Sequence, residues 1–202
     1  MDKLPQSLHL TKVSSPIGTI LLVTDAGVLV SLDYEGYEAR MMRLLTKRYG
    51  PFELVETSPD DQHCSTVEID LVARLHAYLN GELTVIDTIP VNPGGTKFQA
   101  SVWQALRSIP PGTVISYGDL ARQLGNPAAV RAVGTTNGLN PISIVLPCHR
   151  VIGANGSLTG YAGGLDRKRW LLNHEGVDLT NAHTSADSGL QLSLLDRCPP
   201  SP

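Results

Sequence analysis

The chain has 202 residues, which suits one medium domain or two small ones and is ample for a buried core. Hydrophobic residues make up 42% and charged residues 17%, a composition that excludes a disordered or fibrous protein. No apolar run reaches the ~18 residues of a membrane-spanning helix, and the first residues do not resemble a secretory signal. Three widely spaced cysteines (Cys64, Cys148 and Cys198) do not form a disulfide framework, so we expect a protein of the reducing cytoplasm.

The net charge of −3 conceals an uneven distribution along the chain. Residues 1–95 hold 7 Lys/Arg against 13 Asp/Glu, a net charge of −6, whereas residues 96–176 hold 8 against 3, a net charge of +5. The remaining residues carry a net charge of −2. A basic segment between acidic neighbours is typical of a domain that binds a polyanion such as DNA, with chance unevenness as the alternative.

The first half of the chain predicts a small sheet with helices. Runs rich in β-branched and aliphatic residues, separated by turn-forming residues, predict strands at 8–13, 18–24 and 28–32. Amphipathic patterns ended by glycine predict helices at 37–49 and 67–79, and a short strand is predicted at 84–86. Residues 91–95 then form the best candidate linker, so we place one domain at 1–90 and a second at 96–176.

The second half changes to helical periodicity. Helices are predicted at 96–107, at 117–124 with Ser116 as N-cap, at 128–137 and at 168–174. The second and third of these are joined by Leu124-Gly125-Asn126, a helix-turn-helix spacing that many unrelated helix pairs share. Residues 142–146 predict a short buried strand or extended run, and residues 177–202 predict a poorly ordered polar tail.

Cys148 follows the apolar run and precedes His149 and Arg150, a setting that suits a nucleophilic thiol. A thiol attacks as its thiolate, which a neighbouring base and positive charge favour. His149 is a candidate base, and Glu175 is a candidate carboxylate to orient the imidazole. The alternative is a buried cysteine with an incidental histidine beside it. Metal binding is disfavoured, because no cysteine has a partner at ligand spacing.

Residues 96–176 closely resemble the O6-alkylguanine-DNA alkyltransferase family, and in particular its bacterial stand-alone members. The resemblance rests on motifs in the family's order and spacing: FQASVW from Phe98, IPPGTVISY from Ile109, RAVG from Arg131, NP from Asn140, IVLPCHRVI from Ile144, GYAGG from Gly160, and the Lys168, WLL and HEG positions up to Gly176. Residues 1–90 match only loosely, in the manner of the family's variable N-terminal domain.

The resemblance implies an α/β (α+β) fold. The N-terminal part would be a small, ribonuclease H-like sheet with helices, and the C-terminal part a mostly helical, winged-helix-like domain with a helix-turn-helix. The implied activity is DNA repair by irreversible transfer of a methyl or alkyl group from O6-alkylguanine, and from O4-alkylthymine, to Cys148. One molecule repairs one lesion without a cofactor, as a monomer on double-stranded DNA and with no membrane partner.

The resemblance also assigns roles to individual residues. Cys148 would be the nucleophile, His149 would take its proton through a water, and Glu175 would hold His149. Tyr117 would crowd the phosphate, help to rotate the nucleotide out, and protonate or hydrogen-bond the guanine. DNA contacts are implied for Ser116, Tyr117, Arg131 and Thr136, with Arg131 filling the vacated space in the stack.

The implied substrate pocket is formed by Val151, Tyr161, Ala162, Gly163 and Lys168, with Asn140 stabilising the turn before the cysteine segment. The carbonyls of Cys148 and Val151 would accept hydrogen bonds from the guanine amine. Position 162 is alanine where some members carry serine, so only its backbone N–H remains. Some members bind zinc in the N-terminal domain, but Cys64 is the only cysteine there and we expect no metal.

Plainer interpretations exist for several of these residues. Tyr117 could cover the first turn of its helix, Arg131 could lie on a solvated face, and Lys168 could belong to a solvated run of charges. Three other functions compete with alkyl transfer: a non-enzymatic alkyltransferase-like protein, which would lack Cys148, a cysteine hydrolase, and a helix-turn-helix regulator.

Overall fold

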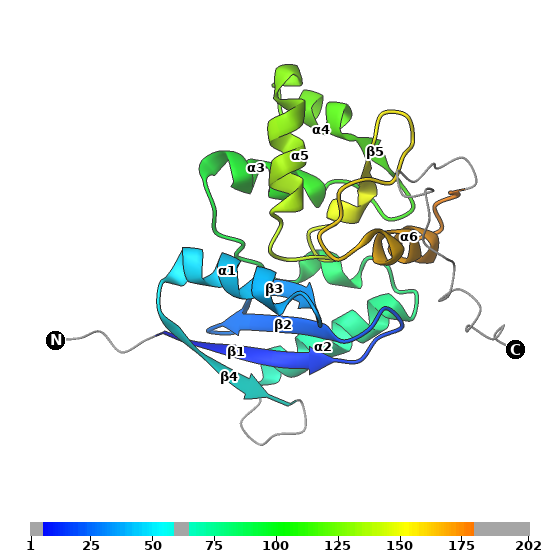
Figure 1. Ribbon diagram of the computed structural model, residues 1–202. Helices are drawn as coiled ribbons and strands as arrows, with labels where there is room; N and C mark the ends of the chain where they lie inside the picture. The colour runs from blue at the N-terminus through cyan, green and yellow to red at the C-terminus, as the bar shows by residue number, and fades with distance from the viewer. Residues whose placement is uncertain (1–5, 59–64, 180–202) are drawn as a thin grey trace, which may run out of the picture.

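The computed structural model describes residues 6–58 and 65–179 (Figure 1). Its first part is a four-stranded sheet in the order β3-β2-β1-β4, with strands β1 (Gln6–Val13), β2 (Ile20–Asp25), β3 (Val28–Tyr34) and β4 (Phe52–Thr57). The first three strands are antiparallel neighbours, whereas β4 pairs parallel with β1. The three strands predicted from the N-terminal sequence are therefore confirmed, and β4 is an element that the prediction missed.

Two helices accompany the sheet, α1 (Glu38–Tyr49) and α2 (Thr66–Leu79), close to their predicted bounds. A capping box fixes the start of α2, because Ser65 accepts from the Glu68 N–H while the Glu68 carboxylate accepts from the Ser65 N–H. The predicted strand at 84–86 is wrong, since Val85–Thr88 form the 3₁₀ helix η1. The Asp87 N–H donates to the Thr84 carbonyl, so the chain turns on itself instead of pairing with a neighbour.

The second part is mostly helical. It contains α3 (Lys97–Leu106), α4 (Tyr117–Gln123), the 3₁₀ turn η2 (Pro127–Ala129), α5 (Val130–Gly138), the 3₁₀ turn η3 (Cys148–Arg150) and α6 (Leu165–His174). A two-residue parallel pair, β5 (Ile115–Ser116) and β6 (Val151–Ile152), was not predicted. The predicted helix-turn-helix pair is confirmed as α4 and α5, although the second helix begins with the 3₁₀ turn.

Strand β3 is an edge of the sheet, and the second part of the chain closes it. The Leu32 N–H donates to the Pro141 carbonyl at 2.9 Å, and the Ser143 N–H donates to the Leu32 carbonyl at 3.0 Å. Farther along β3, the Leu29 N–H donates to the Pro90 carbonyl. Figure 1 accordingly shows the C-terminal helices on the β3 side of the sheet. The extended run predicted at 142–146 thus contributes a single bridge, Leu32 with Ile142, and no full strand.

The two parts share one hydrophobic core. Buried Leu32 and Tyr34 of the sheet belong to the same cluster as Val102 of α3 and Ile144 of the segment before Cys148. The segment that carries the cysteine is therefore packed against the sheet rather than suspended between separate domains. Among the described residues, no helix has the length and apolar character needed to cross a bilayer. The predicted tail lies outside the described residues from 180 onward.

Arg40, which forms an ion pair with the buried Asp33 inside the first part, also joins the two parts. Arg40 of α1 contacts the Asp33 carboxylate at 2.5 Å and donates to the carbonyls of Gly138 at 3.1 Å and Asn140 at 2.8 Å. Burial raises the pKa of Asp33 above its ordinary value, and the Arg40 guanidinium opposes that rise. One guanidinium therefore compensates a buried charge in the sheet and satisfies the carbonyls at the end of α5.

Replacing Arg40 by leucine is expected to destabilise the protein by about 3–5 kcal/mol, because Asp33 would remain buried without its partner. Urea unfolding followed by circular dichroism would measure the loss. The matched control is Lys12→Ala, which breaks an ion pair with Glu56 whose side chains are 48% and 62% exposed. That change should cost less than ~1 kcal/mol. Similar losses in both variants would contradict the role assigned to Arg40.

Candidate active site

Cys148 lies at the start of η3, directly after the apolar segment, and only 3% of it is exposed. Asn140 forms the turn that leads into this segment: its amide donates to the Leu146 carbonyl at 2.7 Å, and its side-chain oxygen accepts from the Ile142 N–H at 3.0 Å. Ile144, within the turn, adopts a φ of 66°, a backbone conformation that is strained for a β-branched residue. Such strain persists only where the surroundings enforce it, so Cys148 directly follows a rigid segment.

The surroundings of Cys148 act on its thiol in opposite directions. Burial raises the pKa of Cys148, whereas a hydrogen bond from the Asn140 side chain and the charge of Lys168 lower it. The net pKa lies above the ordinary value. The resting cysteine is therefore a protonated thiol at neutral pH, and it needs a base when it reacts.

His149, the neighbour of Cys148, is fully buried against the carboxylate of Glu175. The distance from His149 Nε2 to Glu175 Oε1 is 2.9 Å. Burial would raise the pKa of Glu175, but hydrogen bonds and charges from His149 and Arg150 outweigh it and hold that pKa well below the ordinary value. Glu175 is thus ionised, and the predicted His149–Glu175 pair is brought together although 26 residues separate them.

The hydrogen-bond pattern assigns the tautomer of His149. An ionised carboxylate only accepts, so Nε2 carries the proton and donates it to Glu175. The other ring nitrogen, Nδ1, is buried and has no hydrogen-bond partner among the described residues. Burial also lowers the pKa of His149 and favours the neutral ring. His149 therefore presents a free, basic lone pair on Nδ1, as a general base requires.

Arg150 and Tyr78 complete the environment of Glu175. The sequence indicated Arg150 only as a positive charge beside the thiol and indicated no role for Tyr78. Arg150 donates through Nε to Glu175 Oε2 at 2.9 Å and through Nη2 to Oε1 at 2.8 Å. The hydroxyl of Tyr78, on α2, donates a hydrogen bond to Oε1 at 2.7 Å. Arg150 adjoins the motif and could have been suspected, whereas no local signal connects Tyr78 to a residue 97 positions away.

The predicted pocket residues gather around the loop between β6 and α6. The hydroxyls of Tyr161 and Tyr34 are 2.7 Å apart, so a residue of the sheet supports the pocket tyrosine. Gly163 packs directly on Tyr34, since a Cβ at position 163 would lie 2.3 Å from Cε2 of that ring. Ala162 is half-buried between them. Only glycine fits at position 163, and the sheet thereby forms one wall behind the predicted pocket.

Lys168 is fully buried, so its interpretation as part of a solvated run is wrong. Its ammonium donates to the carbonyls of Val151 at 2.6 Å and Thr159 at 2.7 Å and ties β6 to the pocket loop. Burial lowers the pKa of Lys168 to about 8. The two carbonyls predicted to accept from guanine thus already have donors within the protein. Lys168 bonds the carbonyl of Val151, and the carbonyl of Cys148 accepts both from the Asn137 amide at 3.3 Å and from the Val151 N–H.

Tyr117 is the first residue of α4 and lies between α5 and the loop that joins β6 to α6. Its hydroxyl donates to the Thr159 carbonyl at 3.3 Å, and its ring lies beside Gly134 of α5. Burial raises the pKa of Tyr117, so the phenol stays protonated and able to donate. Ser116 caps α4 in a capping box with Asp119, which occupies its hydroxyl.

The predicted DNA residues of α5 differ in exposure. Arg131 is exposed on the first turn of the helix. Thr136 is only 4% exposed, and its carbonyl accepts from the Trp103 indole N–H at 3.0 Å. The predicted DNA contact is therefore wrong for the Thr136 side chain, because a short helix buries one face while it presents the other.

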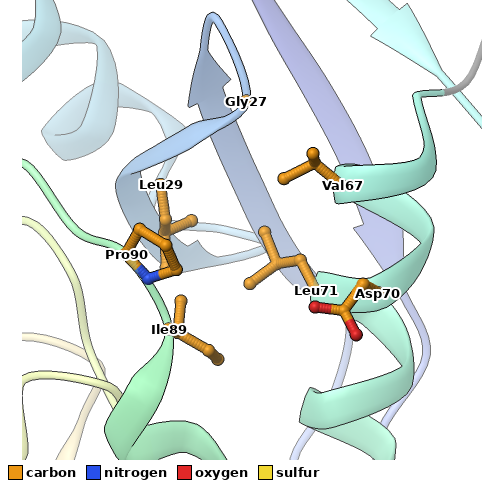
Figure 2. A pocket seen from close by; sticks show the side chains of 7 residues that line it. All are labelled: Gly27, Leu29, Val67, Asp70, Leu71, Ile89 and Pro90. Carbon is orange, nitrogen blue, oxygen red and sulfur yellow. The ribbon is translucent and has the colours of Figure 1, made fainter.

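Two further features lie apart from this cluster. A shallow pocket between the β2–β3 turn, α2 and the segment before α3 is lined by none of the predicted site residues (Figure 2). Among the described residues, no three His, Cys, Asp or Glu side chains lie together as metal ligands. Cys64 and Cys198 lie outside those residues.

Comparison with known families accounts for both parts of the chain. Residues 97–177 match the 6-O-methylguanine DNA methyltransferase DNA binding domain, and residues 8–93 match the ribonuclease-like domain of the same proteins. The chain belongs to the 6-O-methylguanine DNA methyltransferase family. Its activity is therefore that of a methylated-DNA–protein-cysteine methyltransferase, a DNA-repair enzyme that transfers an alkyl group to a cysteine.

Individual members of the methyltransferase family align over most of the chain. A methylated-DNA–protein-cysteine methyltransferase of Salmonella typhimurium is 50% identical over 169 residues, which cover 82% of this chain and 94% of the relative. One from Mycobacterium tuberculosis is 45% identical over 168 residues, covering 83% and 92%.

Solved structures agree with these matches. The crystal structure of Mycobacterium tuberculosis OGT in complex with DNA matches with a TM-score of 0.68 at 40% identity, covering 83% of this chain and 92% of that one. The O6-methylguanine-DNA methyltransferase of the archaeon Pyrococcus kodakaraensis matches with a TM-score of 0.65 at 26% identity, covering 84% and 99%. The predicted α/β fold class and family are confirmed.

Replacing Lys168 by methionine is expected to destabilise this methyltransferase by about 1–3 kcal/mol, because the carbonyls of Val151 and Thr159 both lose a charged donor. Arg169→Met is the matched control, since Arg169 makes no hydrogen bond or ion pair with the rest of the described chain, and its loss should stay within ~0.5 kcal/mol. Thermal and urea unfolding would compare the two. Equal losses of stability in the two variants would contradict a stabilising role for the hydrogen bonds of Lys168.

The same variant tests the pKa of Lys168. A lysine whose pKa falls from 10.5 to about 8 on folding binds fewer protons in the folded state than in the unfolded state between those values. Its contribution to stability therefore rises with pH across that window. Unfolding free energies of the wild type should show this rise between pH 8 and 10.5, and Lys168→Met should show a smaller one. Identical slopes would contradict the lowered pKa.

Proposed function

We propose that Cys148 is the acceptor of the alkyl group and that His149 and Glu175 activate it. The observation that carries this proposal is the buried cysteine beside a histidine whose Nε2 is held by an ionised carboxylate and whose Nδ1 is free. His149 accepts the thiol proton through a water molecule, and Glu175 stabilises the imidazolium that forms. The burial that raises the thiol pKa also leaves the thiolate poorly solvated and hence reactive.

The reaction is a single displacement. The Cys148 sulfur forms a bond to the alkyl carbon as the bond from that carbon to guanine O6 breaks, and the electron pair passes to the guanine. A proton donated by Tyr117 to the departing base balances the charge, and the thiol proton held by His149 restores the phenol through solvent. The product thioether is stable to water, so each molecule acts once and requires no cofactor.

The DNA-contact surface consists of the helix-turn-helix pair α4–α5, with Arg131, Tyr117 and Ser116 as its proposed contacts. Arg131 is exposed at the start of α5, from which it can enter the stack and replace an extruded base. Tyr117 lies between that helix and the pocket loop, a position suited to guiding the rotated nucleotide. The substrates are O6-alkylguanine and O4-alkylthymine in duplex DNA.

The pocket that receives the base is formed by Val151, Tyr161, Ala162 and Gly163, with Lys168 and Asn140 as supports. We further propose that the protein acts as a cytoplasmic monomer, with domains at 1–90 and 96–176 joined by 91–95. A cysteine hydrolase is the second candidate, favoured only by the Cys148–His149–Glu175 arrangement itself. A non-enzymatic lesion-binding protein is disfavoured by the presence of Cys148.

Replacing Cys148 by serine is expected to abolish methyl transfer and to leave binding to methylated duplex DNA unchanged within about twofold, since the thiol makes no phosphate contact. Mass spectrometry after incubation with methylated DNA should show one added methyl group per wild-type molecule and none on Cys148→Ser. Cys198→Ser is the control and should be methylated like the wild type. Repeated turnover would identify a hydrolase, and transfer by Cys148→Ser would refute the proposal.

Replacing Arg131 by alanine is expected to slow transfer from duplex DNA by about 10- to 100-fold, because a few kcal/mol of unstacking are no longer compensated. Transfer from free O6-benzylguanine, which needs no extrusion, should change by less than about threefold. Arg43→Ala, on α1, removes the same charge and should affect neither substrate. Equal losses of Arg131→Ala on both substrates would mean that Arg131 shapes the pocket instead.

A further inference from the structure

Tyr78 connects the N-terminal part of the molecule directly to the proposed catalytic carboxylate. The residue lies in the last turn of α2, its side chain is fully buried, and its hydroxyl donates to Glu175 Oε1 at 2.7 Å. The same oxygen accepts from His149 Nε2 at 2.9 Å and Arg150 Nη2 at 2.8 Å. Three donors therefore converge on one carboxylate oxygen, and one of them comes from outside the cysteine motif.

The position of the Tyr78 hydroxyl is fixed by a second contact next to Glu175. His174 donates from Nε2 to the Tyr78 carbonyl at 2.7 Å, and the two rings meet edge to face with centroids 5.3 Å apart. His174 is in turn stacked on Trp170 of α6 at 4.8 Å. The end of α2 and the end of α6 are thus joined by side chain and backbone together, which holds the phenol at a set distance from the carboxylate.

We propose that Tyr78 is a positioning residue for alkyl transfer: its hydroxyl competes with His149 for Glu175 Oε1 and thereby restrains the basicity of His149. This inference rests on the proposed roles of His149 and Glu175. A carboxylate oxygen shares its negative charge among its donors, so each added donor weakens its bond to the others. Without Tyr78, Oε1 interacts more strongly with the His149 N–H, and the protonated imidazole becomes more stable.

The titratable and charged groups around this pair come from three elements. Glu175 faces Tyr78 from α2 and His149 and Arg150 from η3, and Lys168 of α6 acts on His149 through its charge. Arg150 keeps both carboxylate oxygens occupied, so Glu175 stays ionised when Tyr78 is changed. Removal of the Tyr78 hydroxyl therefore acts on His149 without discharging its partner.

The test replaces Tyr78 by phenylalanine, which removes the hydroxyl and retains the ring that fills the core. The matched control is Tyr49→Phe, because Tyr49 also donates its hydroxyl to a carboxylate, Asp25, at 3.0 Å, but on the far side of the N-terminal part. NMR of the full-length protein would follow the His149 ring, through the Hε2 proton and the ring nitrogens. Single-turnover methyl transfer from duplex DNA would be measured across pH in parallel.

In Tyr78→Phe we expect the His149 Hε2 resonance to move downfield. We also expect the acid limb of the pH–rate profile of transfer to shift to higher pH by about half to one unit. Transfer at the acidic end should be about three- to tenfold slower, with a plateau within about twofold of the wild type. Tyr49→Phe should match the wild type in both measurements. An unchanged or upfield His149 resonance, with or without a uniform rate loss at every pH, would overturn the inference.

The two readouts separate this inference from the proposed function. The NMR signals report on His149 and Glu175 whether or not the protein transfers a methyl group. If the His149 resonance moves as expected while the pH profile of transfer does not, then Tyr78 restrains His149 as inferred and His149 is not the base. If Cys148→Ser still accepts methyl groups, the proposed function fails independently of Tyr78.

Discussion

The buried carboxylate of Glu175 is the group on which the active site depends. An ionised carboxylate inside a protein is costly unless its lone pairs are filled, and here His149, Arg150 and Tyr78 fill them. These donors come from the cysteine turn and from the N-terminal helix α2, while Glu175 itself follows α6. Satisfying one charge therefore brings three separate segments together and orients the histidine beside Cys148.

The segment before Cys148 is constrained in the same manner. Pro141 and Ser143 bond to the edge strand β3, Asn140 spans the turn, and Arg40 holds the Asn140 carbonyl from α1. Such a network can maintain the strained backbone at Ile144. The N-terminal sheet thus supports the segment before Cys148, which in turn covers the exposed edge of that sheet.

The two parts of the chain differ in net charge as well as in the contacts that they contribute to the site. The acidic N-terminal part supplies packing, the supporting sheet and a fourth hydrogen bond to Glu175, whereas the basic C-terminal part carries the helix-turn-helix surface and the cysteine. The proposed DNA-contact surface belongs to a part of the chain whose net charge is opposite to that of DNA, and Cys148, the proposed acceptor, is buried within the shared core.

The sequence by itself determined the elements with strong local signals and the residues of the cysteine motif. Runs rich in β-branched and aliphatic residues predicted β1 to β3, capping residues and periodicity predicted the helices, and the motif around Cys148 indicated the family and the His149–Glu175 pair. Strand β4 was missed because only Thr57 among its six residues is buried, and the predicted strand at 84–86 was wrong because Val85–Thr88 form a 3₁₀ helix. Only the tertiary structure decided the buried state of Lys168 and Thr136 and the parts played by Tyr78, Tyr34 and Arg40. Those contacts join residues far apart in the chain, and they follow from which polar groups must be paired once the core excludes water.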